Sequence, residues 1–317
     1  MTTDTNLTPD TGLPVATPVG STQAAASDEA SSASGALAAP NTDSSSVSSL
    51  PGRVGGRALA KLRQDLTERD WRILRLVADH RYLTTRQIES FCFTNLGSPE
   101  SAERTTRRVL ARLAHEGVLR SLARRIGGVR AGSGATVYYL APAGARLLDG
   151  DAGHHFRSRE PSERFLLHCL AIGETHLELN GLAARDDVTS IEVALEPACW
   201  RPYTGPGGES RSLQPDLALT IQGADYEDRW FIEVDMGTES IPTILTKAAQ
   251  YDTYRRTGSE QAAHEVFPMV CWLMLGTKAD MRAATLRQRL RSKGYPDGMF
   301  HVCTEDQLSL TLTGDVA

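Results

Sequence analysis

Residues 214–221 read Gln-Pro-Asp-Leu-Ala-Leu-Thr-Ile, and residues 230–235 read Trp-Phe-Ile-Glu-Val-Asp. Both stretches alternate apolar residues with other residues, which predicts two β-strands. The polar segment between them contains a glycine and suits a hairpin loop. Because side chains alternate along a strand, Glu233 and Asp235 share one face, and Asp216 opens the neighbouring strand. An antiparallel pair of strands therefore brings three carboxylates to one edge.

A helix is predicted next, over residues 240–254, with Lys247, Tyr251 and Tyr254 on one face. Carboxylates at strand ends opposite a helical lysine are the groups that metal-dependent cleavage of a phosphodiester needs. The carboxylates hold the ion, and the ion orients water or stabilises the phosphate. One of the two tyrosines could instead form a covalent phosphate ester. The sequence offers no histidine pair at metal-binding spacing to accompany such a nucleophile, which favours tyrosines of the core or of a groove.

The charge of the chain is unevenly distributed. The whole chain has a formal net charge of −5. Residues 53–130 contain 17 Lys and Arg and 8 Asp and Glu, a local charge of +9, which leaves −14 for the remainder. A basic segment inside an acidic protein predicts a local site for a polyanion.

Cysteine spacing and hydropathy indicate the compartment. The five cysteines include no Cys-x-x-Cys pair, which argues against a zinc knuckle or a disulfide framework and fits a reducing cytoplasm. No apolar run is as long as a membrane span, and the first residues lack the pattern of a signal peptide. We therefore expect a soluble cytoplasmic protein that has no membrane partner.

Three predicted helices occupy the basic segment, and each begins at a capping residue, Thr67, Thr84 or Ser98. Gln87 completes a capping box with Thr84, and Pro99 stands at the first position of the third helix. The third helix separates an apolar face from a basic face. The basic face consists of four arginines: Arg104, Arg107, Arg108 and Arg112.

Two short strands are predicted after these helices, at residues 118–126 and 136–140. They flank a glycine-rich tip, and the hairpin carries Arg124, Arg125 and Arg130. Two helices, an arginine-faced helix and a basic hairpin, in that order, predict a winged helix-turn-helix that binds double-stranded DNA. The third helix then enters the major groove, and the hairpin lies along phosphate. The alternative is a solvated basic face on a helical protein-interaction module.

A chain of 317 residues is long enough for two domains, and its composition divides it into four segments. Residues 1–52 contain no aromatic residue and cannot bury enough apolar surface, so we expect a disordered tail. Residues 53–150 form the predicted winged helix domain, and its basic lead-in up to Arg63 is either an arm for the DNA backbone or a solvated linker. Residues 151–161 are a predicted linker, and residues 162–317 form the second domain.

The second domain has a recognisable predicted order. A long helix begins near residue 162, strands follow at residues 188–195, 216–221 and 230–235, and the helix of Lys247 precedes an apolar strand. This αβββαβ order makes the domain α/β, and the whole chain α+β when the helical segment is included. With a Pro-Asp at one strand start and an acid-x-acid on the next, it resembles the PD-(D/E)xK nuclease core.

That resemblance implies a site for Mg²⁺ or Mn²⁺. Asp216 and Glu233 match the two metal carboxylates of the pattern. Its third position, a lysine, is here Asp235, and Lys247 matches the helical lysine that replaces it in some members.

Three further residues match positions near the metal in some members of this group. Glu174, in the long first helix, matches an additional acidic group and would be a metal ligand. Gln250 and Tyr251 match a polar helix position. These assignments depend on the resemblance alone.

From about residue 66 to residue 310 the chain is similar to the bacterial replication-relaxation family. The similarity includes the signature at residues 233–239, Glu-Val-Asp-Met-Gly-Thr-Glu, followed by Lys247 and Tyr251. It implies DNA handling in replication or mobilisation of plasmids and integrative elements, including conjugation. Other replication or mobilisation proteins and a second copy of the chain are the implied protein partners. A nuclease or nickase, a non-catalytic accessory protein and a transcriptional regulator all remain open.

Overall fold

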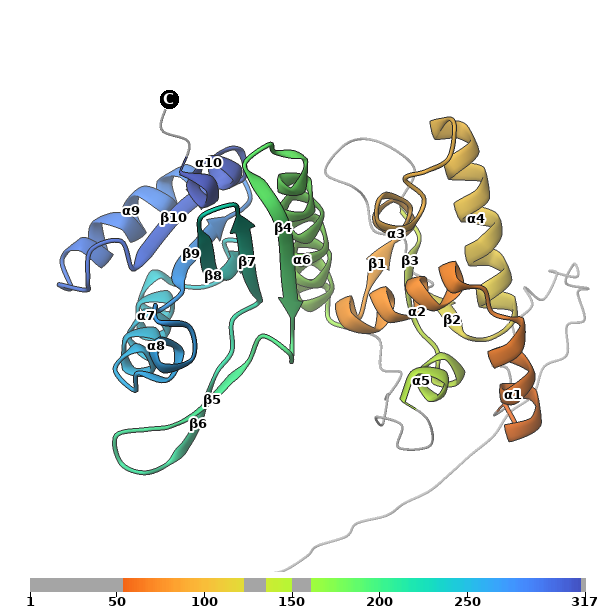
Figure 1. The fold of residues 1–317 in the computed structure, drawn as a ribbon, viewed down its shortest axis with the longest axis horizontal. Helices are drawn as coiled ribbons and strands as arrows, with labels where there is room; N and C mark the ends of the chain where they lie inside the picture. The colour runs from red at the N-terminus through yellow and green to blue at the C-terminus, as the bar shows by residue number, and fades with distance from the viewer. Residues whose placement is uncertain (1–53, 123–134, 150–160, 315–317) are drawn as a thin grey trace, which may run out of the picture. The chain divides into compact units, whose positions relative to one another are not determined.

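The computed structural model describes residues 54–122, 135–149 and 161–314. The first part contains a small sheet and, up to residue 115, four helices: α1 (Gly56–Asp65), α2 (Glu68–His80), α3 (Thr85–Cys92) and α4 (Pro99–His115) (Figure 1). The sheet has the order β1-β3-β2 and is antiparallel, with β1 (Leu83–Thr84), β2 (Leu119–Ser121) and β3 (Val137–Leu140). Helix α5 (Pro142–Asp149) follows it.

The capping residues define the helix starts as the sequence predicts. The Thr84 hydroxyl accepts a hydrogen bond from the backbone N–H of Gln87, whose side chain returns a bond to the N–H of Thr84. Ser98 caps α4 with Pro99 in its first turn. Thr67 also forms a capping box, in which Asp70 is the partner. These bonds satisfy N–H groups that a helix otherwise leaves unpaired in its first turn.

The basic lead-in forms helix α1 over residues 56–65 and is not an irregular linker there. Leu59 and Leu62 pack against the core of the first part. Arg63 also donates a hydrogen bond of 3.0 Å to the carbonyl of Leu147. Two leucines three residues apart bury enough apolar surface to hold a short helix against this core.

Three sequence predictions fall largely on residues outside those described. They are the disordered tail (residues 1–52), the linker (residues 151–161, of which the structure describes residue 161) and the hairpin arginines Arg124, Arg125 and Arg130.

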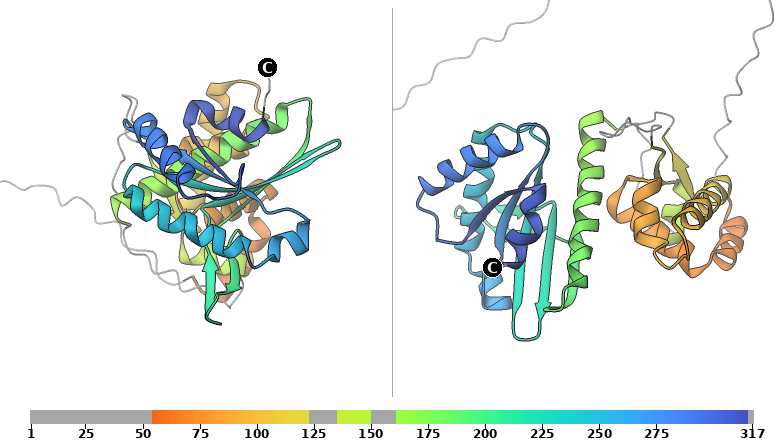
Figure 2. Two further views of the ribbon diagram at one scale, coloured as in Figure 1. Left: turned by 90° about the vertical axis from the view of Figure 1, so that its left-hand side faces the viewer. Right: turned by 90° about the horizontal axis from the view of Figure 1, so that it is seen from above.

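The second part is built on a five-stranded sheet of order β10-β9-β8-β7-β4. Its strands are β4 (Val188–Leu195), β7 (Leu217–Gly223), β8 (Glu227–Asp235), β9 (Met269–Met274) and β10 (Phe300–Thr304). Strand β8 is central, antiparallel to β7 and parallel to β9. The order confirms an α/β fold, because helices cover both faces of the sheet (Figure 2).

Alternate residues of the sheet belong to two different apolar layers. One layer joins the sheet to α7 (Ile241–Arg255) and α9 (Ala279–Arg291). The other joins it to α6 (Glu163–Gly181) and α10 (Leu308–Thr313). Phe231 of β8 lies in the first layer and Ile232 in the second, so Glu233 and Asp235 point to the side of α7 and α9.

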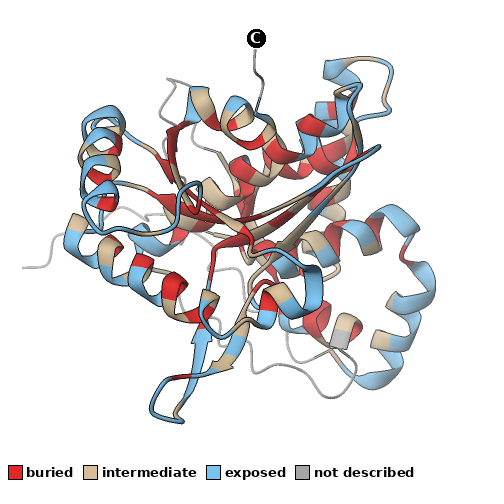
Figure 3. Ribbon diagram, turned by 60° about the vertical axis from the view of Figure 1, so that its left-hand side comes forward, coloured by how far each residue is buried: buried red, intermediate tan, exposed pale blue. Residues whose placement is uncertain are grey.

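Several short elements were not expected from the sequence. They are α8 (Ser259–His264), short 3₁₀ helices at Leu182–Ala184 and Glu305–Gln307, and a separate hairpin of β5 (Arg201–Thr204) and β6 (Ser210–Leu213). Most hairpin residues are exposed or half-buried (Figure 3). Such strands lack the apolar alternation that reveals a strand in a sequence.

Helix α6 belongs to the second apolar layer of the sheet and also contacts the helices of the first part. The side-chain amide of Gln87 in α3 donates a hydrogen bond of 2.8 Å to the carbonyl of Leu170 in α6. His80 of α2 and His176 of α6 contact each other at 3.0 Å between Nε2 and Nδ1. The described residues from 54 onward accordingly belong to one compact unit. No helix among them is long and apolar enough to cross a membrane.

The histidine pair predicts a loss of stability in acid. Burial, with a contribution from His176, lowers the pKa of His80 to about 3, and burial lowers the pKa of His176 to about 4. Unfolded histidines bind protons below about pH 6.5. The contribution of the pair to stability is therefore complete above that pH and is lost as the pH falls toward about 4, on the order of 1 kcal/mol per pH unit for each ring. Urea unfolding at several pH values measures this loss.

A His80→Phe/His176→Leu variant provides the control, because neither new side chain titrates. We expect its urea midpoint to fall less than that of the wild type over the same pH range. Parallel curves for the two proteins would contradict the assignment.

Candidate active site

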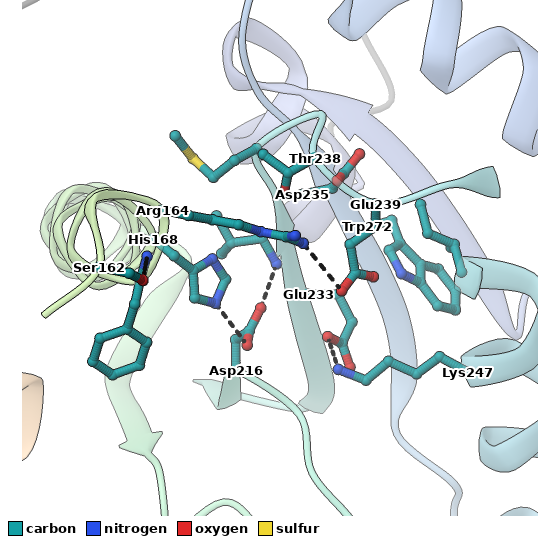
Figure 4. Close-up of a pocket in the computed structure, with 14 residues that line it drawn as sticks. Ser162, Arg164, His168, Asp216, Glu233, Asp235, Thr238, Glu239, Lys247 and Trp272 are labelled. Atoms are coloured by element: carbon teal, nitrogen blue, oxygen red, sulfur yellow. Dashed lines mark hydrogen bonds and ion pairs between the residues drawn. The ribbon is translucent and has the colours of Figure 1, made fainter. Parts of the chain in front are cut away.

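A cavity of about 250 Å³ lies where β8 ends, between α6 and α7 (Figure 4). Besides Arg164 and Glu239, five ionisable groups of its lining come from four elements. They are His168 of α6, Asp216 before β7, Glu233 and Asp235 of β8, and Lys247 of α7. The structure thus brings together four of the residues that the sequence predicts for the site.

Asp216 is a buried carboxylate held from two sides. Its Oδ2 accepts a hydrogen bond of 2.7 Å from the backbone N–H of Val234, and its Oδ1 lies 3.2 Å from Nε2 of His168. Burial raises the pKa of Asp216, but the hydrogen bond with His168 and the charge of Lys247 outweigh burial, so the net shift is downward. Asp216 is therefore charged near neutral pH.

Glu233 is buried in the central strand, with an exposed fraction of 4%. The Lys247 ammonium and the Tyr251 hydroxyl each donate a hydrogen bond to its carboxylate. Burial raises the pKa of Glu233 to about 7, although Lys247 opposes the shift. Burial lowers the pKa of Lys247, but Glu233 and Asp216 outweigh it, and the net shift is upward.

Asp235 forms an ion pair with α9. Its Oδ2 accepts hydrogen bonds of 2.5 and 2.9 Å from Arg282, and its Oδ1 accepts one of 3.1 Å from the N–H of Gly237. Gly237 adopts a positive φ of 76°, which favours glycine at this turn. Asp235 lines the cavity, yet its side chain anchors α9 to the end of β8.

Two residues of the predicted site lie elsewhere. Glu174 is exposed, forms a hydrogen bond with Gln87 and does not line the cavity. It follows His168 by six residues, and at 100° per residue it lies on a different face of α6. Gln250 is exposed on α7 and does not line the cavity either. Both residues lie on helices that border the cavity, but the register of each helix turns these two side chains away from it.

His168 is a site residue that the sequence analysis did not single out. The hydrogen bond with Asp216 raises the pKa of His168, and burial opposes that shift. A histidine among apolar residues of a helix indicates a functional site only weakly, because hydrogen-bonded histidines of a protein core produce the same pattern.

The two tyrosines do not suit a nucleophilic role. Tyr251 is fully buried, and burial followed by the charge of Glu233 raises its pKa well above the ordinary value. The Tyr254 hydroxyl donates a hydrogen bond of 2.7 Å to Glu260. A nucleophile must lose its proton and reach the phosphate. Tyr251 instead orients Glu233, and Tyr254 belongs to the core.

The carboxylates of the cavity are candidate metal ligands. Among the described residues, no group of three or more His, Cys, Asp and Glu side chains could hold a metal ion. Mg²⁺, however, is commonly bound by only one or two carboxylates, with water and substrate phosphate completing its shell. Asp216 and Glu233 line one cavity and fit that smaller requirement.

The arginines of α4 divide into two pairs. Arg104 and Arg108 are exposed, and no ion pair is found for either among the described residues. Arg107 pairs with Glu103. Arg112 lies 2.6 Å from the buried Asp70 and also pairs with Glu116. The sequence places all four arginines on one basic face, but Arg112 compensates a buried acid of α2.

The Asp235–Arg282 pair predicts a large loss of stability in Arg282→Ala. Asp235 has an exposed fraction of 7%, so removal of its partner leaves a buried carboxylate uncompensated. Such a change costs about 3–5 kcal/mol. Arg289→Ala, on the exposed side of the same helix, should change stability by less than about 0.5 kcal/mol. Equal urea midpoints for the two variants would show that Asp235 does not need Arg282.

Comparison with known proteins now identifies the family. No curated protein and no solved structure matches the chain significantly. The sequence pattern of the replication-relaxation family matches residues 74–270, from α2 to β9, which include Asp216, Glu233 and Lys247. The match confirms the resemblance seen in the sequence. Because it covers more than half of the residues, the chain belongs to the replication-relaxation family.

Proposed function

We propose that the chain is a DNA-binding protein of plasmid or integrative-element replication or mobilisation that nicks DNA with the help of a divalent metal ion. Family membership points to the replication or relaxation of plasmids. The observation that carries the catalytic part is the convergence of Asp216, Glu233 and Lys247 on one cavity. Two carboxylates and a lysine are the groups that phosphodiester cleavage of this kind uses.

The first part of the chain is proposed to be a winged helix that binds double-stranded DNA. Its helices α2, α3 and α4 and the pairing of β2 with β3 have the order of that module. Arg104 and Arg108 lie exposed on α4, where they can reach phosphate or base edges. Arg107 contributes once its exposed and therefore weak pair with Glu103 opens.

The metal is proposed to be Mg²⁺ or Mn²⁺, and Asp216 and Glu233 would hold it. The ion would supply positive charge to the phosphate and lower the pKa of a bound water. The residues of the chain have separate tasks. His168 fixes the orientation of Asp216, Tyr251 fixes that of Glu233, and Lys247 keeps a proton on Nζ and thus a positive charge beside the cavity.

One observation favours a second candidate, a non-catalytic DNA-binding accessory protein with the same fold. Each acid of the cavity already has a cationic or hydrogen-bonding partner: His168 for Asp216, Lys247 for Glu233 and Arg282 for Asp235. A closed set of ion pairs stabilises a scaffold without any metal. Metal binding by the purified chain discriminates between the two candidates.

Asp216→Asn and Glu233→Gln should abolish both metal binding and nicking, because each keeps the size of the side chain and removes an anionic ligand. Lys247→Ala should slow nicking and leave metal affinity largely intact, since its ammonium acts on the phosphate or the attacking water. Calorimetry with Mn²⁺ and conversion of supercoiled plasmid to open circles measure the two effects.

Glu174→Gln is the matched control for these variants. It removes a predicted metal ligand that the structure places outside the cavity, so both readouts should stay at the wild-type level. If the wild type neither binds a divalent ion nor nicks plasmid, the accessory role replaces the catalytic one. Loss of metal binding in Glu174→Gln would contradict the assignment of ligands made here.

The DNA-binding proposal predicts a change in salt dependence. An Arg104→Ala/Arg108→Ala variant should bind duplex DNA more weakly, and the slope of log affinity against log salt should flatten by about 2, since each lost phosphate contact contributes about 0.9. Arg229→Ala is the control, because Arg229 pairs with Glu227 on the hairpin of β7 and β8. An unchanged slope, measured by fluorescence anisotropy, would favour a protein-interaction module.

A further inference from the structure

Phe165 is a large apolar side chain that the fold leaves open beside a charged cavity. Its exposed fraction is 39%, and it lines the same cavity as Asp216 and Glu233. Neither the apolar layers of the sheet nor the core of the first part includes it. An exposed aromatic ring next to carboxylates and a lysine suggests a contact with a ligand that has both a flat apolar part and a negative charge.

The position of this ring is well defined by its helix. The Ser162 hydroxyl caps α6 and accepts a hydrogen bond of 3.3 Å from the backbone N–H of Phe165. His168, which contacts Asp216, follows Phe165 by three residues and therefore lies on a neighbouring part of the same helix face. The cap fixes the start of the helix, and the helix places the backbone of Phe165 one turn before His168.

A displaceable cation lines the same cavity. The side chain of Arg164 reaches over the cavity toward Glu239 (Figure 4). This pair is loose, at 4.0 Å, and the two side chains are 62% and 46% exposed. Exposed pairs of this kind contribute little to stability. A phosphate group can therefore replace Glu239 as the partner of Arg164 without a large cost.

Other contacts cover only part of the ring. The guanidinium carbon of Arg81 lies 5.8 Å from the ring centroid, and Tyr82 meets the ring edge-on at 6.3 Å between centroids. These two contacts leave 39% of the Phe165 surface exposed, and Phe165 lines the cavity. Proteins that bind single strands stack unpaired bases on aromatic side chains, and arginine adds cation–π contacts there.

We propose that Phe165 stacks on an unpaired base of a single DNA strand, next to the phosphate that the cavity and Arg164 bind. Bases inside a duplex already stack on each other, so an aromatic ring gains stacking only from a base that is free of its partner. This inference rests on one part of the proposed function, namely that the cavity binds DNA phosphate. It names the substrate at this site as single-stranded or locally opened DNA, whereas α4 is proposed to bind the duplex.

The test compares four substitutions in the full chain, with Ca²⁺ in place of Mg²⁺ to limit cleavage. The probe is a fluorescently labelled single-stranded oligonucleotide, and the same sequence as a blunt duplex is the second probe. Phe165→Leu and Phe165→Ala should weaken single-strand binding by about tenfold, and Phe165→Trp should retain it. Duplex affinity should stay unchanged in all three. Met281→Ala removes a side chain with an exposed fraction of 61% on α9 and should alter neither affinity.

Base stacking has its own spectroscopic signature. An oligonucleotide that carries 2-aminopurine should lose fluorescence on binding to the wild type and to Phe165→Trp, and should lose less on binding to Phe165→Leu. Wild-type single-strand affinity in Phe165→Leu would overturn the inference. Equal losses of single-strand and duplex affinity, with a lower unfolding temperature, would also overturn it, because they would assign Phe165 to packing against Arg81 and Tyr82.

The outcome is separable from that of the nicking experiment. If Phe165→Leu loses single-strand binding while the wild type shows no metal binding, the base-stacking role stands and the catalytic proposal fails. If the wild type nicks plasmid and Phe165→Leu binds the single strand normally, the stacking role alone fails.

Discussion

The burial of Glu233 in the central strand is the constraint on which the second part of the chain depends. A carboxylate removed from water costs several kcal/mol unless charges and hydrogen bonds replace the water. Lys247 and Tyr251 supply that replacement, and both come from α7. An ion pair and a hydrogen bond, as well as apolar contacts, therefore fix the position of α7 on the sheet. Two residues later, Asp235 and Arg282 attach α9 to the same strand.

The topology of the sheet explains why Asp216 joins this cluster. Strand β8 runs antiparallel to β7, so the end of β8 lies beside the start of β7. Asp216 immediately precedes β7, and its carboxylate can therefore accept the N–H of Val234 near the end of β8. Strand β9 runs parallel to β8 and covers the other side. The three acids meet because strand direction, not sequence proximity, places them at one edge.

Much of this arrangement is predictable from the sequence, because the signals are local. The alternation of Trp230 to Asp235 reveals a strand, and an acid between Ile232 and Val234 reveals a buried charge that needs a partner. The capping box of Thr84 and Gln87 has a similar local cause.

What the sequence does not reveal depends on tertiary pairing. Arg112 belongs to a basic face by helical periodicity, yet it pairs with Asp70, which lies on another helix. Glu174 follows from a family pattern whose register does not hold in α6. His168 becomes informative only once Asp216 is known to lie within 3.2 Å of it.

Helix α6 connects the DNA-binding chemistry proposed for the first part with the cavity of the second. Gln87, at the start of α3, holds the carbonyl of Leu170 at 2.8 Å, and His168, two residues earlier on α6, contacts Asp216. Gln87 is itself held by its capping box with Thr84. A helix is stiff over such a short distance, so the bond from Gln87 and the contact with Asp216 hold neighbouring points of one rigid element. Gln87, which completes the capping box at the start of α3, therefore also contacts the helix that carries His168 to the candidate active site.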